Sequence, residues 1–171
     1  MSKIDESYHE LLNNILQNGY LYDDPNRKGV QRLEIPSYTF KHKFSDGFPA
    51  ITTKKLHYKN VVTELIWFLS GDTNIKYLVD NGCNIWNKDA YNYYLKNYIG
   101  VGGARLMSRE EWLSEIGKFP KVGNLGPVYG KQWRDFNGVD QIANLIKGLK
   151  EKPLGTEYIV NSWNAGNLAN M

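Results

Sequence analysis

The chain has 171 residues, of which 42% are hydrophobic and 23% are charged, as in an ordinary globular domain or part of a larger one. Its formal net charge is only +3 and its Lys and Arg residues are scattered, so no basic block indicates nucleic-acid or membrane-surface binding. The single cysteine, Cys83, excludes an internal disulfide framework and a cysteine-rich zinc site.

Apolar periodicity and end signals predict five helices. They cover residues 2–17, 57–70, 74–81, 108–116 and 140–150. Gly71 and Gly82 mark two of the C-terminal ends, because glycine readily adopts the backbone conformation that ends a helix. Ser108 and Glu111 have the spacing of a capping box, which indicates the start of the fourth helix.

Two of these helices carry clear apolar stripes. In helix 57–70 the stripe consists of Val61, Val62, Leu65, Ile66 and Leu69. Trp67 and Phe68 lie off this stripe, so the helix is apolar nearly all round and is expected to be buried on most sides. In helix 140–150 the stripe predicted to face inward consists of Ile142, Leu145, Ile146 and Leu149.

A period of two from Leu33 to Phe44 predicts extended chain. The alternation changes face at Pro36, which indicates a bend or bulge between two strand pieces. The Tyr-Ile-Val run at 158–160 is predicted to be a buried strand. Because helices and strands alternate without strict βαβ regularity, we expect an α/β (α+β) fold with a mixed β-sheet flanked by helices.

The chain shows no internal repeat and no linker, so residues 1–171 are predicted to form a single domain. Residues 87–122 are less regular and are interpreted as a variable insert. Within this insert, residues 98–105 are rich in glycine but lack the lysine and the hydroxyl side chain of a phosphate-binding loop. We therefore expect a flexible segment there.

The N-terminal residues and the lone thiol indicate where the protein works. Residues 1–12 include acidic side chains and lack the apolar run of a signal peptide, and no stretch has the length of a membrane span. A single thiol fits a reducing compartment. We expect a cytoplasmic protein with no nucleic-acid partner, no membrane partner and no metal.

Glu64 and Tyr129 are the main candidates for proton transfer. Glu64 lies between Trp67 and Phe68 on the helical wheel, where desolvation would favour an uncharged carboxyl group. The alternative is a narrow exposed strip, since glutamate is rarely buried. Tyr129 follows Gly-Pro-Val in a turn that lets the backbone approach a ligand closely, although most such turns bind nothing.

Cationic side chains could bind an anionic ligand at two places. Lys54 and His57, together with Lys55, would form an electropositive rim, or else a solvated helix start. Arg27 lies in a loop, where arginine can clamp a phosphate but is more often plain surface. Cys83 follows Gly82 at a helix C-terminus, where the helix dipole disfavours a thiolate, so buried packing is the preferred interpretation.

Several ordered segments resemble the thymidylate synthase family, and they span nearly the whole chain outside the insert. The matching segments are Arg27, GFPAITTKKLH at 47–57, ELIWFLSGDTN at 64–74, Ile85-Trp86, NLGPVYGKQWR at 124–134, VDQI at 139–142 and Ser162-Trp163-Asn164. The resemblance implies conversion of dUMP to dTMP with 5,10-methylenetetrahydrofolate as carbon donor and reductant, by a homodimer. In that chemistry a cysteine thiolate adds to C6 of the pyrimidine.

Carried over by position, the resemblance implies a role for each candidate. Glu64 would organise the water and proton network, and Tyr129 would assist proton removal at C5. Arg27 would bind the substrate phosphate. The folate would be lined by Lys54, His57, Ile85 and Trp86.

The chain also departs from the family pattern. The nucleophilic cysteine belongs to a Pro-Cys-His segment that the family has just past the position of Met171, so we expect an incomplete fold and no dTMP formation by this chain alone. Thr156 and Glu157 stand where the family has two phosphate-binding arginines, and Asn87 stands where it commonly has aspartate. Two alternatives are a pyrimidine nucleotide hydroxymethylase of the same scaffold and a non-catalytic nucleotide-binding remnant.

Overall fold

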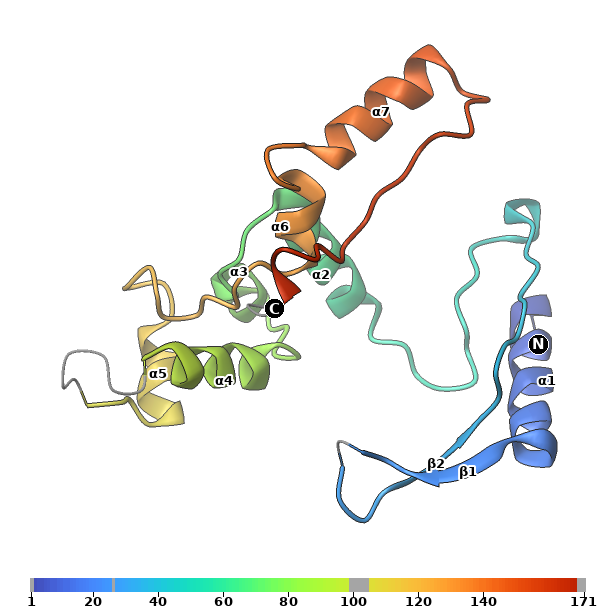
Figure 1. Ribbon diagram of the computed structural model, residues 1–171, viewed down its shortest axis with the longest axis horizontal. Coiled ribbons are helices and arrows are strands. Elements are labelled where there is room, and N and C mark those ends of the chain that lie inside the picture. Colours follow the sequence, from blue (N-terminus) through green and yellow to red (C-terminus); the bar gives the residue numbers. More distant parts are fainter. Residues whose placement is uncertain (1, 26, 99–104, 169–171) are drawn as a thin grey trace. The chain divides into compact units, whose positions relative to one another are not determined.

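A computed structural model describes residues 2–25, 27–98 and 105–168 (Figure 1). The chain packs as two compact units, residues 1–57 and 58–171. The elements of the first unit are α1 (Lys3–Asn18), β1 (Tyr20–Asp23), β2 (Gln31–Glu34) and the short 3-10 helix η1 (Phe44–Asp46). Those of the second are α2 (Tyr58–Ser70), α3 (Lys76–Asp80), α4 (Asn87–Tyr98), α5 (Arg109–Glu115), α6 (Tyr129–Arg134) and α7 (Gln141–Glu151).

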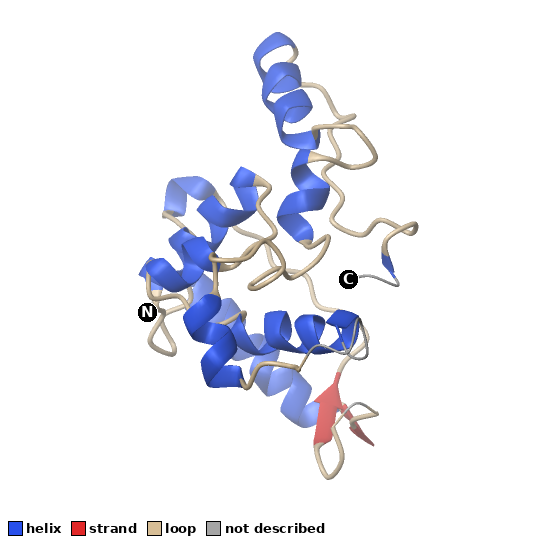
Figure 2. Ribbon diagram, turned by 90° about the vertical axis from the view of Figure 1, so that its left-hand side faces the viewer, coloured by secondary structure: helices blue, strands red, loops and turns tan. Residues whose placement is uncertain are grey.

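The first unit combines one helix with one antiparallel strand pair. α1 begins with a capping box, in which the Ser2 hydroxyl accepts from the Asp5 amide while the Asp5 carboxylate accepts from the Ser2 amide. β1 and β2 pair in register from Tyr20 opposite Glu34. A mixed α/β class is thereby confirmed, and the sheet among the described residues is this two-stranded ribbon (Figure 2).

The second unit is organised where two distant segments meet. The backbone of residues 73–75 pairs with that of residues 123–125, since Leu125 donates to the Thr73 carbonyl and Ile75 donates to the Gly123 carbonyl, both at 2.9 Å. The indole of Trp67 donates to the Asn74 carbonyl at 2.8 Å. These bonds place the end of α2 beside the turn that leads into α6.

α6 packs directly on the backbone of α2. A Cβ atom at Gly130 would lie 2.6 Å from the carbonyl oxygen and 2.7 Å from the Cα of Phe68. Phe68 itself contacts four aromatic rings, those of Trp67, Trp86, Tyr129 and Trp133, with centroids 5.2–6.2 Å apart. An aromatic cluster is therefore packed at and around the core of the unit, and its packing requires a residue without a side chain at position 130.

The structure confirms all five predicted helices, with small changes at their ends. α1, α2, α3, α5 and α7 correspond to residues 2–17, 57–70, 74–81, 108–116 and 140–150. The capping box between Ser108 and Glu111 is formed, and Gly71 and Gly82 both have positive φ angles. The elements β1, α4 and α6 were not predicted. No helix in the described parts of the chain is long and apolar enough to cross a membrane.

Two burial predictions are wrong: helix 57–70 is not buried on most sides, and the apolar stripe of helix 140–150 does not face inward. In α2 the face with Thr63, Trp67 and Phe68 is buried, whereas the apolar stripe is half-buried at Val62 and 39–48% exposed at Val61, Leu65, Ile66 and Leu69. In α7 no residue is buried, so its apolar stripe does not face a core either. The Phe68–Gly130 contact selects the buried face of α2, because close packing needs a small residue on the partner helix.

Two strand predictions are also wrong. The first strand piece exists as β2, but residues 38–43 form neither helix nor strand, and Phe44 is part of η1. Residues 158–160 are not a strand, and Ile159 is exposed. A strand requires hydrogen bonds to a neighbour, and no described segment pairs with either stretch. The predicted flexible segment at 98–105 lies almost entirely outside the described residues, and the single-domain prediction stays a prediction.

We predict that Gly130→Ala destabilises the second unit by about 1–3 kcal/mol, because the added methyl group collides with the backbone of Phe68 rather than with a movable side chain. Gly166→Ala is the matched control, since its nearest neighbour would be Asn164 Oδ1 at 3.4 Å, an ordinary contact. The control is expected to stay within about 0.5 kcal/mol of the parent. Urea unfolding followed by tryptophan fluorescence measures both, and equal stability of the two variants would contradict the prediction.

Candidate functional site

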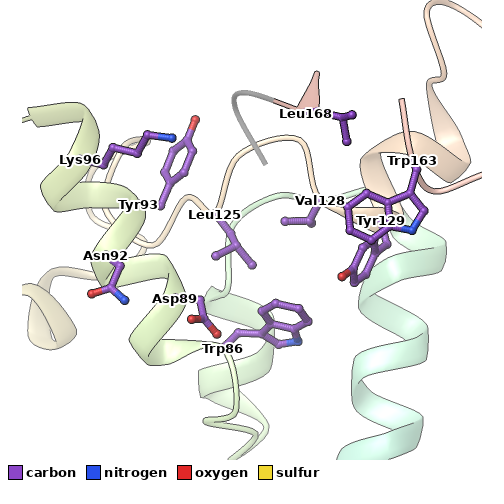
Figure 3. A pocket seen from close by; sticks show the side chains of 10 residues that line it. All are labelled: Trp86, Asp89, Asn92, Tyr93, Lys96, Leu125, Val128, Tyr129, Trp163 and Leu168. Carbon is purple, nitrogen blue, oxygen red and sulfur yellow. The ribbon is translucent and has the colours of Figure 1, made fainter. Parts of the chain in front are cut away.

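A cavity of about 440 Å³ opens between α4 and the start of α6, within the size range of small-molecule sites (Figure 3). All of its lining residues belong to the second unit. They are Trp86, Asp89, Asn92, Tyr93, Lys96, Leu125, Val128, Tyr129, Trp163 and Leu168. Leu125 and Val128 belong to the buried core, so the cavity floor is part of the same packing that joins α2 to α6.

One side of the cavity is aromatic. The rings of Trp86 and Tyr129 are 6.2 Å apart, and those of Tyr129 and Trp163 are 6.0 Å apart, both edge to face. Phe68 packs behind Trp86 and Tyr129. Because Trp163 is 60% exposed, it offers a ring surface on which a planar ligand could stack.

Glu64 lies beside this aromatic side. Its Oε1 accepts a hydrogen bond from the indole nitrogen of Trp86 at 2.7 Å. Glu64 is half-buried and is absent from the cavity lining, so it reaches the site through Trp86, whose ring lines the cavity. The carboxylate is thus held at the edge of a ligand-sized space by a donor that cannot itself be ionised.

Tyr129 is held by the turn that precedes it. Gly126 has a φ of 82°, and its amide donates to Asn124 Oδ1 at 2.7 Å. The Gln132 side chain, which is fully buried, donates to the Pro127 carbonyl at 3.0 Å. The predicted tight turn is therefore present, and Tyr129 is the first residue of the short helix α6.

The same glutamine connects this turn to the Ser162-Trp163-Asn164 segment. The side-chain amide of Asn164 donates to Gln132 Oε1 at 3.1 Å, and both residues are buried. The indole of Trp133 donates to the Ser162 hydroxyl at 2.7 Å. These two bonds fix the backbone on either side of Trp163, which orients that ring toward Tyr129.

α4 forms the opposite side of the cavity, which the sequence analysis missed. Asp89, Asn92, Tyr93 and Lys96 lie at helical spacing along α4 and line the cavity (Figure 3). They fall in the region predicted to be a variable insert. The tyrosines of α4 at 91, 94 and 98 recur at helical spacing and could have indicated the helix.

None of the other candidate residues is among those that line this cavity. Ile85 is 53% exposed and does not line it. Arg27 is in the turn between β1 and β2, where its amide donates to the Asp24 carbonyl at 3.3 Å. Lys54 and His57 are exposed in the irregular chain of the first unit. The structure brings together Glu64, Trp86 and Tyr129, and it describes Arg27, Lys54 and His57 in a separate unit.

The one cysteine of the chain is not among the residues that line the cavity. Cys83 is fully buried in the core, as its position after Gly82 predicted, and does not line the cavity. Within residues 2–25, 27–98 and 105–168, no cluster of three or more His, Cys, Asp or Glu side chains could hold a metal ion. The polar side chains that line the cavity include a carboxylate, an amide and two phenols, which can form hydrogen bonds.

Comparison with known proteins finds matches to one family over nearly the whole chain. The family model described as thymidylate synthase matches residues 6–171. The chain is 42% identical over 170 residues to "Thymidylate synthase" of Mycoplasma pneumoniae and 40% identical over 168 residues to that of Mesoplasma florum. Each alignment covers 97% of this chain and 57% of the relative, so the chain spans somewhat more than half the length of these proteins.

We predict that the Trp86–Glu64 hydrogen bond contributes a coupling free energy of about 1 kcal/mol, reduced from a fully buried charged bond because Glu64 is half-buried. Trp86→Phe, Glu64→Met and the double variant form the mutant cycle, with stability read from urea unfolding. Trp133→Phe is the control, because its indole donates to Ser162 instead, and its coupling to Glu64→Met should be near zero. The prediction would be contradicted if the coupling free energy between Trp86→Phe and Glu64→Met were no larger than that between Trp133→Phe and Glu64→Met.

Proposed function

Because the chain belongs to the thymidylate synthase family, we propose that it supplies part of the site of an enzyme that methylates dUMP to dTMP. The carbon donor and reductant in this proposal is 5,10-methylenetetrahydrofolate. Membership of the family rests on the match over residues 6–171. We place this chemistry in the cytoplasm and in a homodimer, as the family resemblance implies.

The observation that carries this proposal is the position of Glu64. Its carboxylate is held at 2.7 Å by Trp86, and the cavity is lined by Trp86 together with Tyr129. Methyl transfer to a pyrimidine ring requires a proton to leave C5 after the carbon bond forms. A carboxylate and a phenol next to one ligand space can organise the water that carries this proton.

In this proposal the nucleophile is a cysteine thiolate that adds to C6 of the pyrimidine, and the C5 carbanion equivalent then attacks the one-carbon unit of the folate. Glu64 orders the water network, and the Tyr129 hydroxyl assists removal of the C5 proton. Trp86 and Ile85 contact the folate, as do Lys54 and His57. Arg27 binds the phosphate of dUMP.

The aromatic side of the cavity supports binding of planar rings. A pyrimidine and a pterin both present flat faces that stack on aromatic side chains, and Trp86, Tyr129 and Trp163 offer such faces. The α4 side presents the Asp89 carboxylate and the Asn92 amide, which can pair with the N–H and C=O edge of a heterocycle.

A second candidate function is nucleotide binding without catalysis. Cys83 is the one cysteine of this chain, and it is fully buried away from the cavity, so it cannot start the reaction. Thr156 and Glu157 are exposed and supply no cation for a phosphate. A pyrimidine nucleotide hydroxymethylase would instead let water capture the one-carbon intermediate, and the products distinguish these functions.

We predict that the 171-residue chain forms no dTMP from dUMP and 5,10-methylenetetrahydrofolate, because no thiol faces the cavity. Chromatographic assay of the nucleotide products measures this directly. If the coding sequence continues into a Pro-Cys-His segment, the extended protein should form dTMP. A hydroxymethylated nucleotide from the extended protein would favour the hydroxymethylase, and absence of any product would favour the non-catalytic alternative.

We predict that Trp163→Ala weakens binding of dUMP together with a reduced folate by about tenfold, since stacking on one aromatic ring contributes ~1–3 kcal/mol. Trp163 is largely exposed, so the fold should tolerate its loss. Phe119→Ala is the control, because Phe119 is also exposed in the second unit but does not line this cavity. Titration calorimetry measures the affinity, and equal weakening by both variants would contradict the assignment of the cavity.

A further inference from the structure

The chain from residue 48 to residue 57 contains neither helix nor strand, yet it carries Lys54 and His57. One backbone hydrogen bond lies within this segment, from the Ala50 amide to the Phe48 carbonyl at 2.8 Å, as far as the described residues show. Backbone hydrogen bonds therefore contribute little to the order of the segment. Its threonines also form hydrogen bonds to side chains of α1. This segment therefore depends on a helix more than forty residues earlier in the chain.

Asp5 provides the first of these connections. Its Oδ1 accepts from the Thr52 amide at 2.6 Å, and its Oδ2 accepts from the Thr52 hydroxyl at 2.8 Å. The same carboxylate also completes the capping box, accepting from the Ser2 hydroxyl at 2.7 Å and from the Ser2 amide at 3.3 Å. Asp5 is only 1% exposed, so these bonds replace its water shell.

These bonds keep Asp5 charged. The Ser2 hydroxyl, followed by the amide and hydroxyl of Thr52, holds the pKa of Asp5 well below its usual range. A lowered pKa in the folded state means that the carboxylate stabilises the fold above its unfolded pKa and loses this effect only as the pH falls. The connection is therefore present throughout the neutral range.

A second connection lies one helical turn later. A ring nitrogen of His9 and the Thr53 hydroxyl are 3.0 Å apart. Positions 5 and 9 lie on the same face of α1, so adjacent threonines are held by adjacent turns. We call Asp5, His9, Thr52 and Thr53 the α1 clamp.

We propose that Asp5 is a positioning residue, which through the α1 clamp holds Lys54 ready for the carboxylates of a folate glutamate tail. This inference rests on the proposed function for its ligand. Lys54 directly follows Thr53, so the clamp fixes the backbone from which that side chain extends. Ordering this backbone in advance lowers the entropy that binding must overcome. Nothing in the resemblance assigns a role to Asp5.

The first test uses proteolysis to measure how well residues 48–57 are ordered when no ligand is present. Asp5→Asn keeps the size of the side chain but replaces one acceptor oxygen with a donor, so it cannot accept both bonds from Thr52. Trypsin should then cut the chain after Lys54 and Lys55 severalfold faster, relative to cutting after Lys118 in the other unit. Glu6→Gln is the control, because it removes the same charge from an exposed position in the same helical turn.

The second test measures how much the glutamate tail contributes to folate affinity. The parent chain should bind a triglutamate form of the reduced folate about fivefold more tightly than the monoglutamate form, as expected for exposed charge pairs. In Asp5→Asn this ratio should fall toward one, whereas loss of general stability would weaken both forms alike. Thr52→Val repeats the test with the α1 capping box intact. Titration calorimetry of the full chain measures each affinity.

The outcomes separate the inference from the proposed function. The positioning role would be overturned if trypsin cleaved Asp5→Asn and Glu6→Gln equally fast. It would also be overturned if the ratio of triglutamate to monoglutamate affinity were unchanged in both Asp5→Asn and Thr52→Val. Absence of folate binding by the parent chain would overturn the proposed function and the tail assignment with it. Even then, the cleavage rates alone decide whether Asp5 holds the segment.

Discussion

The second unit depends on the contact between Gly130 and the backbone of Phe68, where α6 lies against α2 without an intervening side chain. This close approach places the Phe68 ring against Trp86, Tyr129 and Trp133. With the backbone pairing of residues 73–75 to 123–125, it joins two segments that are about fifty positions apart. The cavity, its aromatic side and the hydrogen bond to Glu64 all follow from that junction.

The site is held by polar groups that are themselves buried. Gln132 has no exposed surface, and its side chain joins the Pro127 turn to Asn164. A buried amide whose nitrogen and oxygen both have partners favours one arrangement, because another arrangement would leave a donor or acceptor unpaired. In the first unit Asp5 has the same property, since it closes a helix end and holds Thr52 at once. Each unit thus uses one buried polar side chain to order an irregular segment.

Local signals in the sequence were reliable wherever short-range chemistry decides the outcome. The capping box at Ser108 and the glycine ends at 71 and 82 appear in the structure, because caps depend on residues within one turn. The apolar stripe of α2 misled, because a helix that is apolar nearly all round does not indicate which face is buried. The buried face of α2 is instead determined by its contact with Gly130, which lies more than sixty positions after Phe68. α4 was missed because its tyrosines and polar residues carry a weak apolar signal.

By itself, the sequence determined the family, the five predicted helices and the candidates Glu64, Trp86 and Tyr129, since each depends on residue type and short spacing. Only the tertiary structure decided that Trp86 donates to Glu64 and that α4 forms the second side of the cavity. It also decided that Asp5 reaches Thr52. These are contacts between residues 22 or more positions apart, and such pairs are selected by packing and by the need to satisfy buried polar groups. Neither requirement can be read from local sequence.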